Sequence, residues 1–244
     1  MEKCPNCSNE FTKSYCNNCG QKIIKGDLTI KMVLSDFVQN VFLFDSTLYK
    51  TLIGLLINPG RLVKSYLGGK KKKYLQPFQF FLLFMTIYLL VLNFFGDTFF
   101  DFINSGLQIE SDKISKAELI QTLVRKNLNV LYFILTPIIA FFIHIFYKKT
   151  KFNYAEMLIF SLYIFGVALL LSSVVIIIGQ FSPKLFVLKS IITLGYIPFA
   201  ITQFTNSKSL LGVVKALMTI ILSYLTFAFL ILVFVSIYVY IFMI

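Results

Sequence analysis

Five apolar stretches, each about as long as a membrane is thick, constrain this chain more than any other feature of its sequence. A helix needs about 20 apolar residues to cross the hydrocarbon core of a bilayer. Of the 244 residues 57% are hydrophobic and only 14% are charged, whereas about a quarter of an ordinary soluble domain is charged. The sequence therefore predicts an all-α membrane protein, with a five-span helical bundle over 77–244. The predicted spans are 77–95, 128–147, 154–178, 185–204 and 214–244.

The basic residues predict how the bundle is oriented. The net charge is +12, and the run Lys70, Lys71, Lys72 and Lys73 stands just before the first span. Cytosolic loops of membrane proteins are enriched in Lys and Arg. The loops after the second and fourth spans are also basic, whereas the loop 96–127 is balanced in charge. We therefore expect an inner (plasma) membrane protein with its N-terminus in the cytosol and its C-terminus outside.

The fourth stretch leaves one alternative open. It contains Lys189 and Pro198, so it could be re-entrant instead of fully spanning. The count would then fall by one, and the C-terminus would lie in the cytosol. We expect kinks at Pro198 and at Pro137, because proline removes a helical hydrogen bond.

Residues 27–76 have the pattern of short amphipathic helices. The first covers about 30–41, where apolar side chains recur at helical spacing. A second, capped by Asp45 or Ser46, ends at Asn58-Pro59-Gly60, and a third runs from Pro59 to Leu67 and stops at Gly68-Gly69. With the four-lysine run beside them, these helices are predicted to lie in the membrane interface, on anionic lipid. In the alternative, they pack on the bundle and the lysines only enforce orientation.

Residues 1–26 contain every cysteine of the chain, in two C-x-x-C pairs: Cys4, Cys7, Cys16 and Cys19. Two such pairs joined by a short loop can supply four thiolates in a tetrahedron, at about 2.3 Å from a Zn²⁺ ion. Gly20 suits the positive-φ turn that follows such a pair. A segment this small cannot build an apolar core, so the metal would supply its folding energy. The pattern predicts an N-terminal zinc ribbon with one structural zinc per chain.

Other chemistries of these cysteines are less consistent with the sequence. Disulfides are rare in the cytosol, and a redox C-x-x-C normally opens a helix in a larger fold. Iron–sulfur ligation is not excluded by the number of ligands alone. Nucleic acid is an unlikely partner, because the segment has few Arg or aromatic residues for stacking.

Several local sequences together resemble a known family. They are the end of the ribbon at 15–21, the Asn58-Pro59-Gly60 break, 66–70 leading to Tyr74 and Pro77-Phe78, and Tyr154-Ala155-Glu156. They resemble an uncharacterised bacterial family of zinc-ribbon-headed polytopic membrane proteins, a domain of unknown function. The resemblance covers nearly the whole chain and implies the ribbon, the amphipathic helices and the multi-span body together. It implies no catalytic residues, and Met157 stands where His is expected in that family.

The spans offer little for catalysis. Their ionisable groups other than tyrosines are His144, Glu156 and Lys189, and no G-x-S-x-G or H-E-x-x-H motif occurs. His144 and Glu156 lie near the cytosolic boundary and are expected to pair with each other there. We therefore predict a non-enzymatic membrane scaffold, sensor or assembly factor whose ribbon contacts a cytosolic protein. Transport of a small solute or lipid is the alternative, and the oligomeric state is not indicated.

Overall fold

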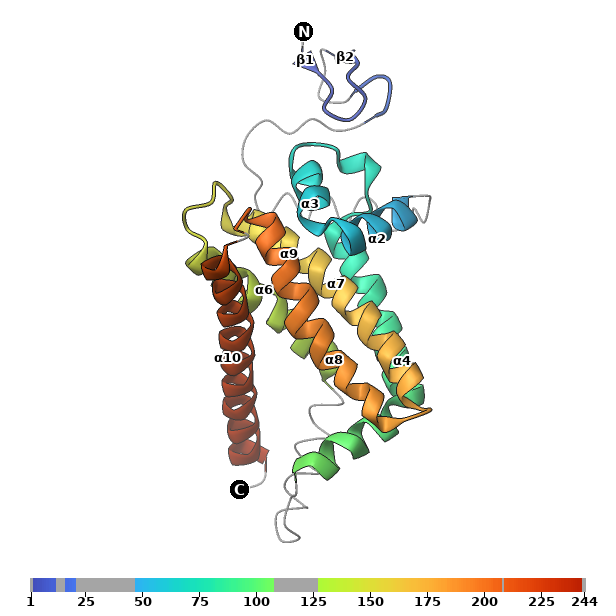
Figure 1. Ribbon diagram of the computed structural model, residues 1–244, viewed down its shortest axis with the longest axis vertical. Coiled ribbons are helices and arrows are strands. Elements are labelled where there is room, and N and C mark those ends of the chain that lie inside the picture. Colours follow the sequence, from blue (N-terminus) through green and yellow to red (C-terminus); the bar gives the residue numbers. More distant parts are fainter. Residues whose placement is uncertain (1, 12–15, 21–46, 108–126, 208, 243–244) are drawn as a thin grey trace.

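Long helices that run side by side make up most of this computed structural model (Figure 1). It describes residues 2–11, 16–20, 47–107, 127–207 and 209–242. The elements in chain order are β1 (Glu2–Lys3), β2 (Glu10–Phe11), α2 (Thr47–Ile57), α3 (Pro59–Leu67), η1 (Lys71–Lys73), α4 (Pro77–Leu107), α6 (Leu128–Phe146), α7 (Tyr154–Gly179), η3 (Pro183–Phe186), α8 (Val187–Ile191), η4 (Ile192–Tyr196), α9 (Ile197–Phe204) and α10 (Leu210–Phe242).

The prediction of a helical body that can cross a membrane is confirmed. Four helical runs are long and apolar enough to span a bilayer: Lys71–Ile103, Tyr154–Gly179, Pro183–Phe204 and Leu210–Phe234. In the region of the second predicted span, the described apolar helix Val130–Phe146 is shorter. The only strands among the described residues are the two-residue β1 and β2, which pair antiparallel in the N-terminal head.

Helix α7 lies at the centre of the packing. Most of its side chains are buried, and α4 and α6 both pack along it. A Cβ atom on Gly166 of α7 would lie only 2.9 Å from Cδ1 of Phe80, so α4 approaches closely here. Tyr163 stacks edge-on against Phe80 and donates its hydroxyl to the carbonyl of Leu75, just before α4 begins. In contrast, α10 leaves most of its described side chains exposed, as expected of a helix that faces lipid.

The helix that contains the first predicted span, 77–95, is longer than that span. Helix α4 continues to Leu107, so the first part of the predicted loop 96–127 is helical. A single glycine costs a helix only about 1 kcal/mol, and Gly96 is buried in this one. Beyond it, Phe99 and Phe102 pack on Phe186 at centroid distances of 5.2 and 5.5 Å. These aromatic contacts stabilise the added turns.

The fourth predicted span is a continuous but irregular helical run. From Pro183 to Phe204 it is long and apolar enough to cross a membrane. Its middle, η4, is π-helical and ends just before Pro198. The helical run is thus irregular just before Pro198, where a kink was predicted, and Pro198 itself lies in the first turn of α9. At the other proline, Pro137, α6 is continuous.

Helices α2 and α3, which we call the collar, meet at the predicted break, Asn58-Pro59-Gly60, and α3 ends at Leu67 as predicted. Pro59 occupies the first turn of α3, and the chain leaves α3 through Gly68 and Gly69, the latter at φ +105°. Leu62, Val63 and Tyr66 of α3 are buried in the same core as α4 and α7. The collar therefore packs on the bundle. The predicted helix at 30–41 and the caps Asp45 and Ser46 lie outside the described residues.

Helix α3 meets α9 at backbone distance. A Cβ atom on Gly60 would lie 2.5 Å from the carbonyl carbon of Gln203. One turn later, Lys64 Nζ donates to the Gln203 carbonyl at 3.2 Å and to Asn206 Oδ1 at 2.6 Å. Burial lowers the pKa of this ammonium. Lys64 thus satisfies a carbonyl at the C-terminal end of α9, where a cation also opposes the helix dipole.

Gly60→Ala should force α3 away from α9, because the atoms that the new methyl group would meet are backbone. We expect a loss of about 1–3 kcal/mol of stability, typical of an overpacked contact, seen as a lower melting temperature in detergent. Gly195→Ala is the matched control, since a Cβ there would meet nothing within 4 Å. Equal melting temperatures for the two variants would contradict the close approach.

Candidate metal centre

The four cysteine side chains converge in the head. Their sulfur atoms all lie within 4.8 Å of one another, with Cys4 Sγ 3.6 Å from Cys19 Sγ and Cys7 Sγ 3.5 Å from Cys16 Sγ. All four are free thiols, because a disulfide would bring two sulfurs to about 2.05 Å. Four sulfurs at 2.3 Å around one ion would be about 3.8 Å apart. The cysteines are therefore close enough to hold a metal ion.

Two similar turns place the thiols. In the first, the Ser8 amide donates to the Cys4 carbonyl at 2.8 Å and Ser8 has φ +61°. In the second, the Gly20 amide donates to the Cys16 carbonyl at 2.7 Å and Gly20 has φ +63°. The sequence predicted the positive φ at Gly20. It gave no such signal for Ser8, which adopts the same conformation without being glycine.

The thiols differ in how readily they ionise. The backbone amide of Cys19 is the largest influence that lowers the pKa of Cys16. For Cys7, the amide of Asn9 acts in the same direction, but burial and the contacts with the other three thiols together raise its pKa to about 11. Thiolates this close repel one another. A cation among them is what would allow all four to ionise together.

The head rests on the segment that follows the collar. A Cβ atom on Gly69 would lie 2.7 Å from Cγ of Pro5, which stands between the first two cysteines. A Cβ atom on Gly20 would lie 2.9 Å from Lys72 Nζ. Both cysteine turns therefore contact the chain at 69–72. The sequence identified Gly68-Gly69 only as a helix stop and missed this seat for the head.

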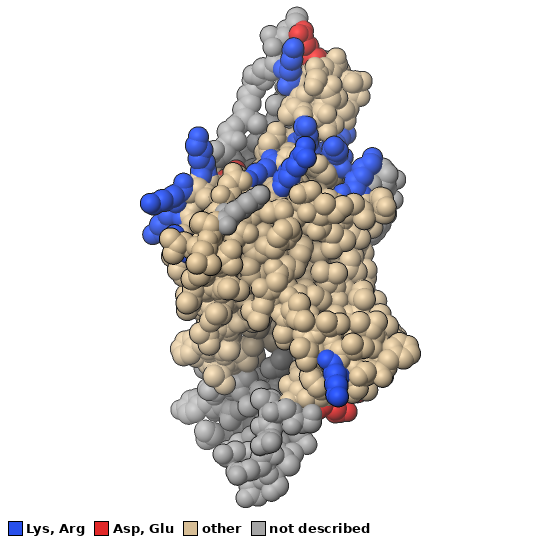
Figure 2. Space-filling model, in the orientation of Figure 1, with Lys and Arg blue, Asp and Glu red and all other residues tan. Residues whose placement is uncertain are grey.

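The four-lysine run, 70–73, overlaps the segment on which the head rests. Lys70, Lys72 and Lys73 are exposed, whereas Lys71 is half-buried with its ammonium 5.9 Å from the Tyr66 ring centroid. Figure 2 shows most of the visible Lys and Arg side chains gathered in a band around this end of the bundle. The head and the C-terminal end of α10 lie at opposite ends of the molecule (Figure 1).

The expected pair of His144 and Glu156 does not form. Glu156 completes a capping box at the start of α7, accepting from the Asn153 amide at 2.8 Å while its own amide donates to Asn153 Oδ1 at 2.9 Å. His144 packs edge-on against Tyr154, at 6.3 Å between centroids, and its buried Nδ1 has no hydrogen-bond partner. The pairing prediction was wrong because a helix N-terminus with four free amides is a nearer partner for the carboxylate.

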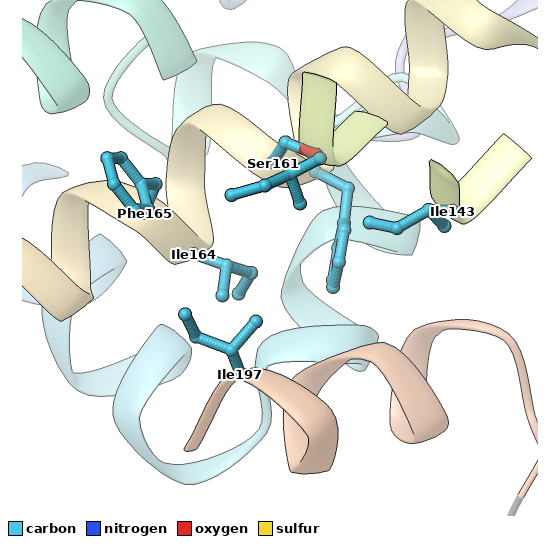
Figure 3. A pocket seen from close by; sticks show the side chains of 7 residues that line it. Ile143, Ser161, Ile164, Phe165 and Ile197 are labelled. Atoms are coloured by element: carbon cyan, nitrogen blue, oxygen red, sulfur yellow. The ribbon is translucent and has the colours of Figure 1, made fainter. Parts of the chain in front are cut away.

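A small pocket inside the bundle offers no chemistry (Figure 3). It lies among α6, α7 and α9, where Ile164 and Ile197 face it from two sides. The hydroxyl of Ser161, which also lines it, donates to the Met157 carbonyl of its own helix at 2.9 Å. Apart from that serine the lining is apolar: Ile139, Ile143, Phe160, Ile164, Phe165 and Ile197.

Comparison with known proteins gives one match. Residues 45–89 match the model of a family described as a protein of unknown function, DUF3667. The matched segment includes the collar, the four-lysine run and the first part of α4. No curated protein and no solved structure matches the chain. The resemblance to a domain of unknown function is thus supported over the segment that joins the head to the bundle.

Gly69→Ala should release the head from its seat. A non-glycine residue at positive φ costs about 1–2 kcal/mol, and its methyl group would also meet Pro5. We expect amide hydrogen exchange at 2–11 to accelerate by roughly tenfold while the head still binds metal. Gly68→Ala is the control, because Gly68 has an ordinary φ of −71°. Unchanged exchange in Gly69→Ala would show that the head is held elsewhere.

Proposed function

We propose that this protein is a non-enzymatic membrane scaffold or assembly factor that presents a structural zinc ribbon to a cytosolic protein partner. The observation that carries the proposal is the convergence of Cys4, Cys7, Cys16 and Cys19 on one point. Four protein ligands close the coordination shell of a tetrahedral zinc ion and leave no position for a substrate. Such a site stabilises a fold and shapes a surface.

The seat of the head supports a scaffold role. Pro5 packs on Gly69, and the collar that ends there is fixed to α9 through Gly60 and Lys64. The ribbon is therefore displayed in a defined position over the bundle. A surface held in this way loses less conformational freedom when a partner binds.

We propose that the helical body crosses the membrane five times, with α6 as one of the spans. Helix α6 has 19 residues and is about 28 Å long, close to the thickness of the hydrocarbon core. Its C-terminal end is joined by a short turn to the start of α7, and α4 and α7 both begin on the collar side. The chain must therefore cross back between α4 and α7, and α6 is the helix that crosses. With the basic band at the cytosolic surface, the N-terminus lies inside and the C-terminus outside a bacterial inner membrane.

We propose that the exposed surface of the collar, which does not pack on the bundle, contacts lipid. Tyr49, Ile53 and Ile57 recur at every fourth position of α2 and are exposed. Lys50 and Arg61 are exposed nearby in the sequence. An apolar stripe next to basic side chains suits the interface of an anionic leaflet.

Transport is less well supported by the same residues. Ser161, Ser173 and Ser223 are buried, and each hydroxyl donates to a carbonyl one turn earlier in its own helix. Small polar residues of this kind usually serve helix packing. They line no polar path in the part of the chain that the structure describes.

Metal analysis tests the ribbon. The purified chain should contain about one zinc per molecule by elemental mass spectrometry, because four thiolates fill one tetrahedral shell. Cys16→Ser with Cys19→Ser should lose it, and Ser8→Ala, which changes no ligand, should keep it. Finding iron instead of zinc would contradict the assignment of the metal as zinc. Thiols that bind no metal and cycle to disulfides would contradict a structural metal site.

Crosslinking in cells tests the scaffold role. The wild-type head should crosslink to a defined cytosolic protein, and the double cysteine variant should lose that product while it still inserts into the membrane. Lys184→Met, at the far end of the bundle, is the matched control and should retain the product. A product that survives loss of the cysteines would contradict the role of the ribbon. Solute flux in liposomes without a crosslinked partner would favour the transporter.

A further inference from the structure

A lysine lies among aromatic rings inside the fourth helical run. Lys189 belongs to α8, and its Nζ is 2.9 Å from the hydroxyl oxygen of Tyr88 on α4, to which it donates. The same atom is 5.3 Å from the centroid of the Tyr88 ring and 4.3 Å from that of Phe99. The faces of both rings can stabilise a cation. The ammonium is thus drawn into the bundle, between α8 and α4.

The hydroxyl groups around it form a short chain. The Tyr132 hydroxyl on α6 lies 3.0 Å from the Tyr88 hydroxyl, and Tyr88 is almost completely buried. Whichever phenol donates to the other, one phenolic proton is left over. Lys189 as an ammonium has two more protons beyond the one given to Tyr88. Among the residues that the structure describes, no acceptor takes these three protons.

Among the described residues, no carboxylate pairs with the ammonium of Lys189, which donates instead to the phenol of Tyr88. An isolated ammonium in an apolar span is costly, and such residues mark functional positions by default. The arrangement has an excess of donors and of positive charge at one point, which is the chemistry that binds an anion.

The helical run beyond Lys189 is irregular and has open space beside Gly195. Helix α8 leads into the π-helical segment η4, and such segments are frequent at functional sites. A Cβ on Gly195 of η4 would meet nothing within 4 Å, and Tyr224 on α10 is partly exposed. Figure 1 shows α10 diverging from α8 away from the head.

We propose that Lys189, Tyr88 and Tyr132 form a binding site for one anionic group, a phosphate or a carboxylate, that enters between α8 and α10. About 9 Å of helix separates Lys189 from Pro183, where the run begins. The site is therefore within reach of the headgroup of a lipid in the leaflet opposite the head, and also of a small free anion. It is independent of the zinc ribbon.

Native mass spectrometry of the full chain in detergent tests the site. The probes are dihexanoyl phosphatidylglycerol, dihexanoyl phosphatidylcholine, decanoate and inorganic phosphate. Wild type should bind at least one anionic probe better than phosphatidylcholine, and Lys189→Met should weaken that binding by about tenfold or more, because a charge-assisted contact is lost. Lys184→Met removes an exposed lysine of the same helical run and should bind as wild type does.

Each result is decisive. Binding of phosphatidylglycerol alone identifies a lipid headgroup, and binding of decanoate or phosphate without it identifies a free anion. No preference over phosphatidylcholine, or an equal loss in Lys184→Met, would overturn the proposal. The anionic probe should also raise the melting temperature of wild type but not of Lys189→Met. If Lys189→Met does not fold, two milder variants replace it. Lys189→Arg keeps the charge and should retain binding of the anionic probe, whereas Tyr88→Phe keeps the ring but loses the hydroxyl and should weaken binding. Weaker binding in Lys189→Arg than in Tyr88→Phe would overturn the proposed site.

Discussion

The contact of Gly60 with the backbone of Gln203 determines how everything on the head side is placed. Only a residue without a side chain allows α3 to come this close to α9. At that distance Lys64 reaches the carbonyl and the asparagine at the end of α9. The chain leaves α3 through Gly69, on which Pro5 of the head rests. The position of the cysteine cluster over the bundle therefore depends on two glycines, Gly60 in the collar and Gly69 just after it.

Side-chain hydrogen bonds tie the collar to the bundle at further points. The Thr51 hydroxyl accepts from the Leu75 amide at 2.9 Å, and the Tyr196 hydroxyl donates to the Leu55 carbonyl at 3.1 Å. Tyr163 of α7 donates to the Leu75 carbonyl. Leu75 thus has both of its backbone groups satisfied by side chains, between η1 and α4 where no helical partner exists. Since unpaired backbone groups are costly away from water, Thr51 and Tyr163 stabilise the entry of the chain into α4.

The sequence predicts those parts of the fold that depend on local chemistry. Asn58-Pro59-Gly60 and Gly68-Gly69 predicted both collar boundaries, because proline and glycine act on their own turn of the chain. The spacing of the cysteines predicted their convergence for the same reason. The extension of α4 beyond Gly96 could not be predicted in this way, since it depends on Phe186, which is distant in sequence. By contrast, the capping box that takes the carboxylate of Glu156 has a local signal, since Asn153 stands three residues before Glu156 at the start of an apolar run, and the expectation of a pair with His144 overlooked it.

The inward position of Lys189 could not be predicted from the sequence either. In the sequence it lies near the end of a span, where a lysine usually extends its ammonium to the membrane surface and so reaches water. In the fold the side chain turns inward to Tyr88, from α4, and lies near Tyr132, from α6. A leucine at this position would pack among the same rings without any cost of desolvation. A cation that pairs with no carboxylate of the described residues needs some other compensation, and the donors that Tyr88, Tyr132 and Lys189 leave unused there favour an acceptor such as the proposed anion.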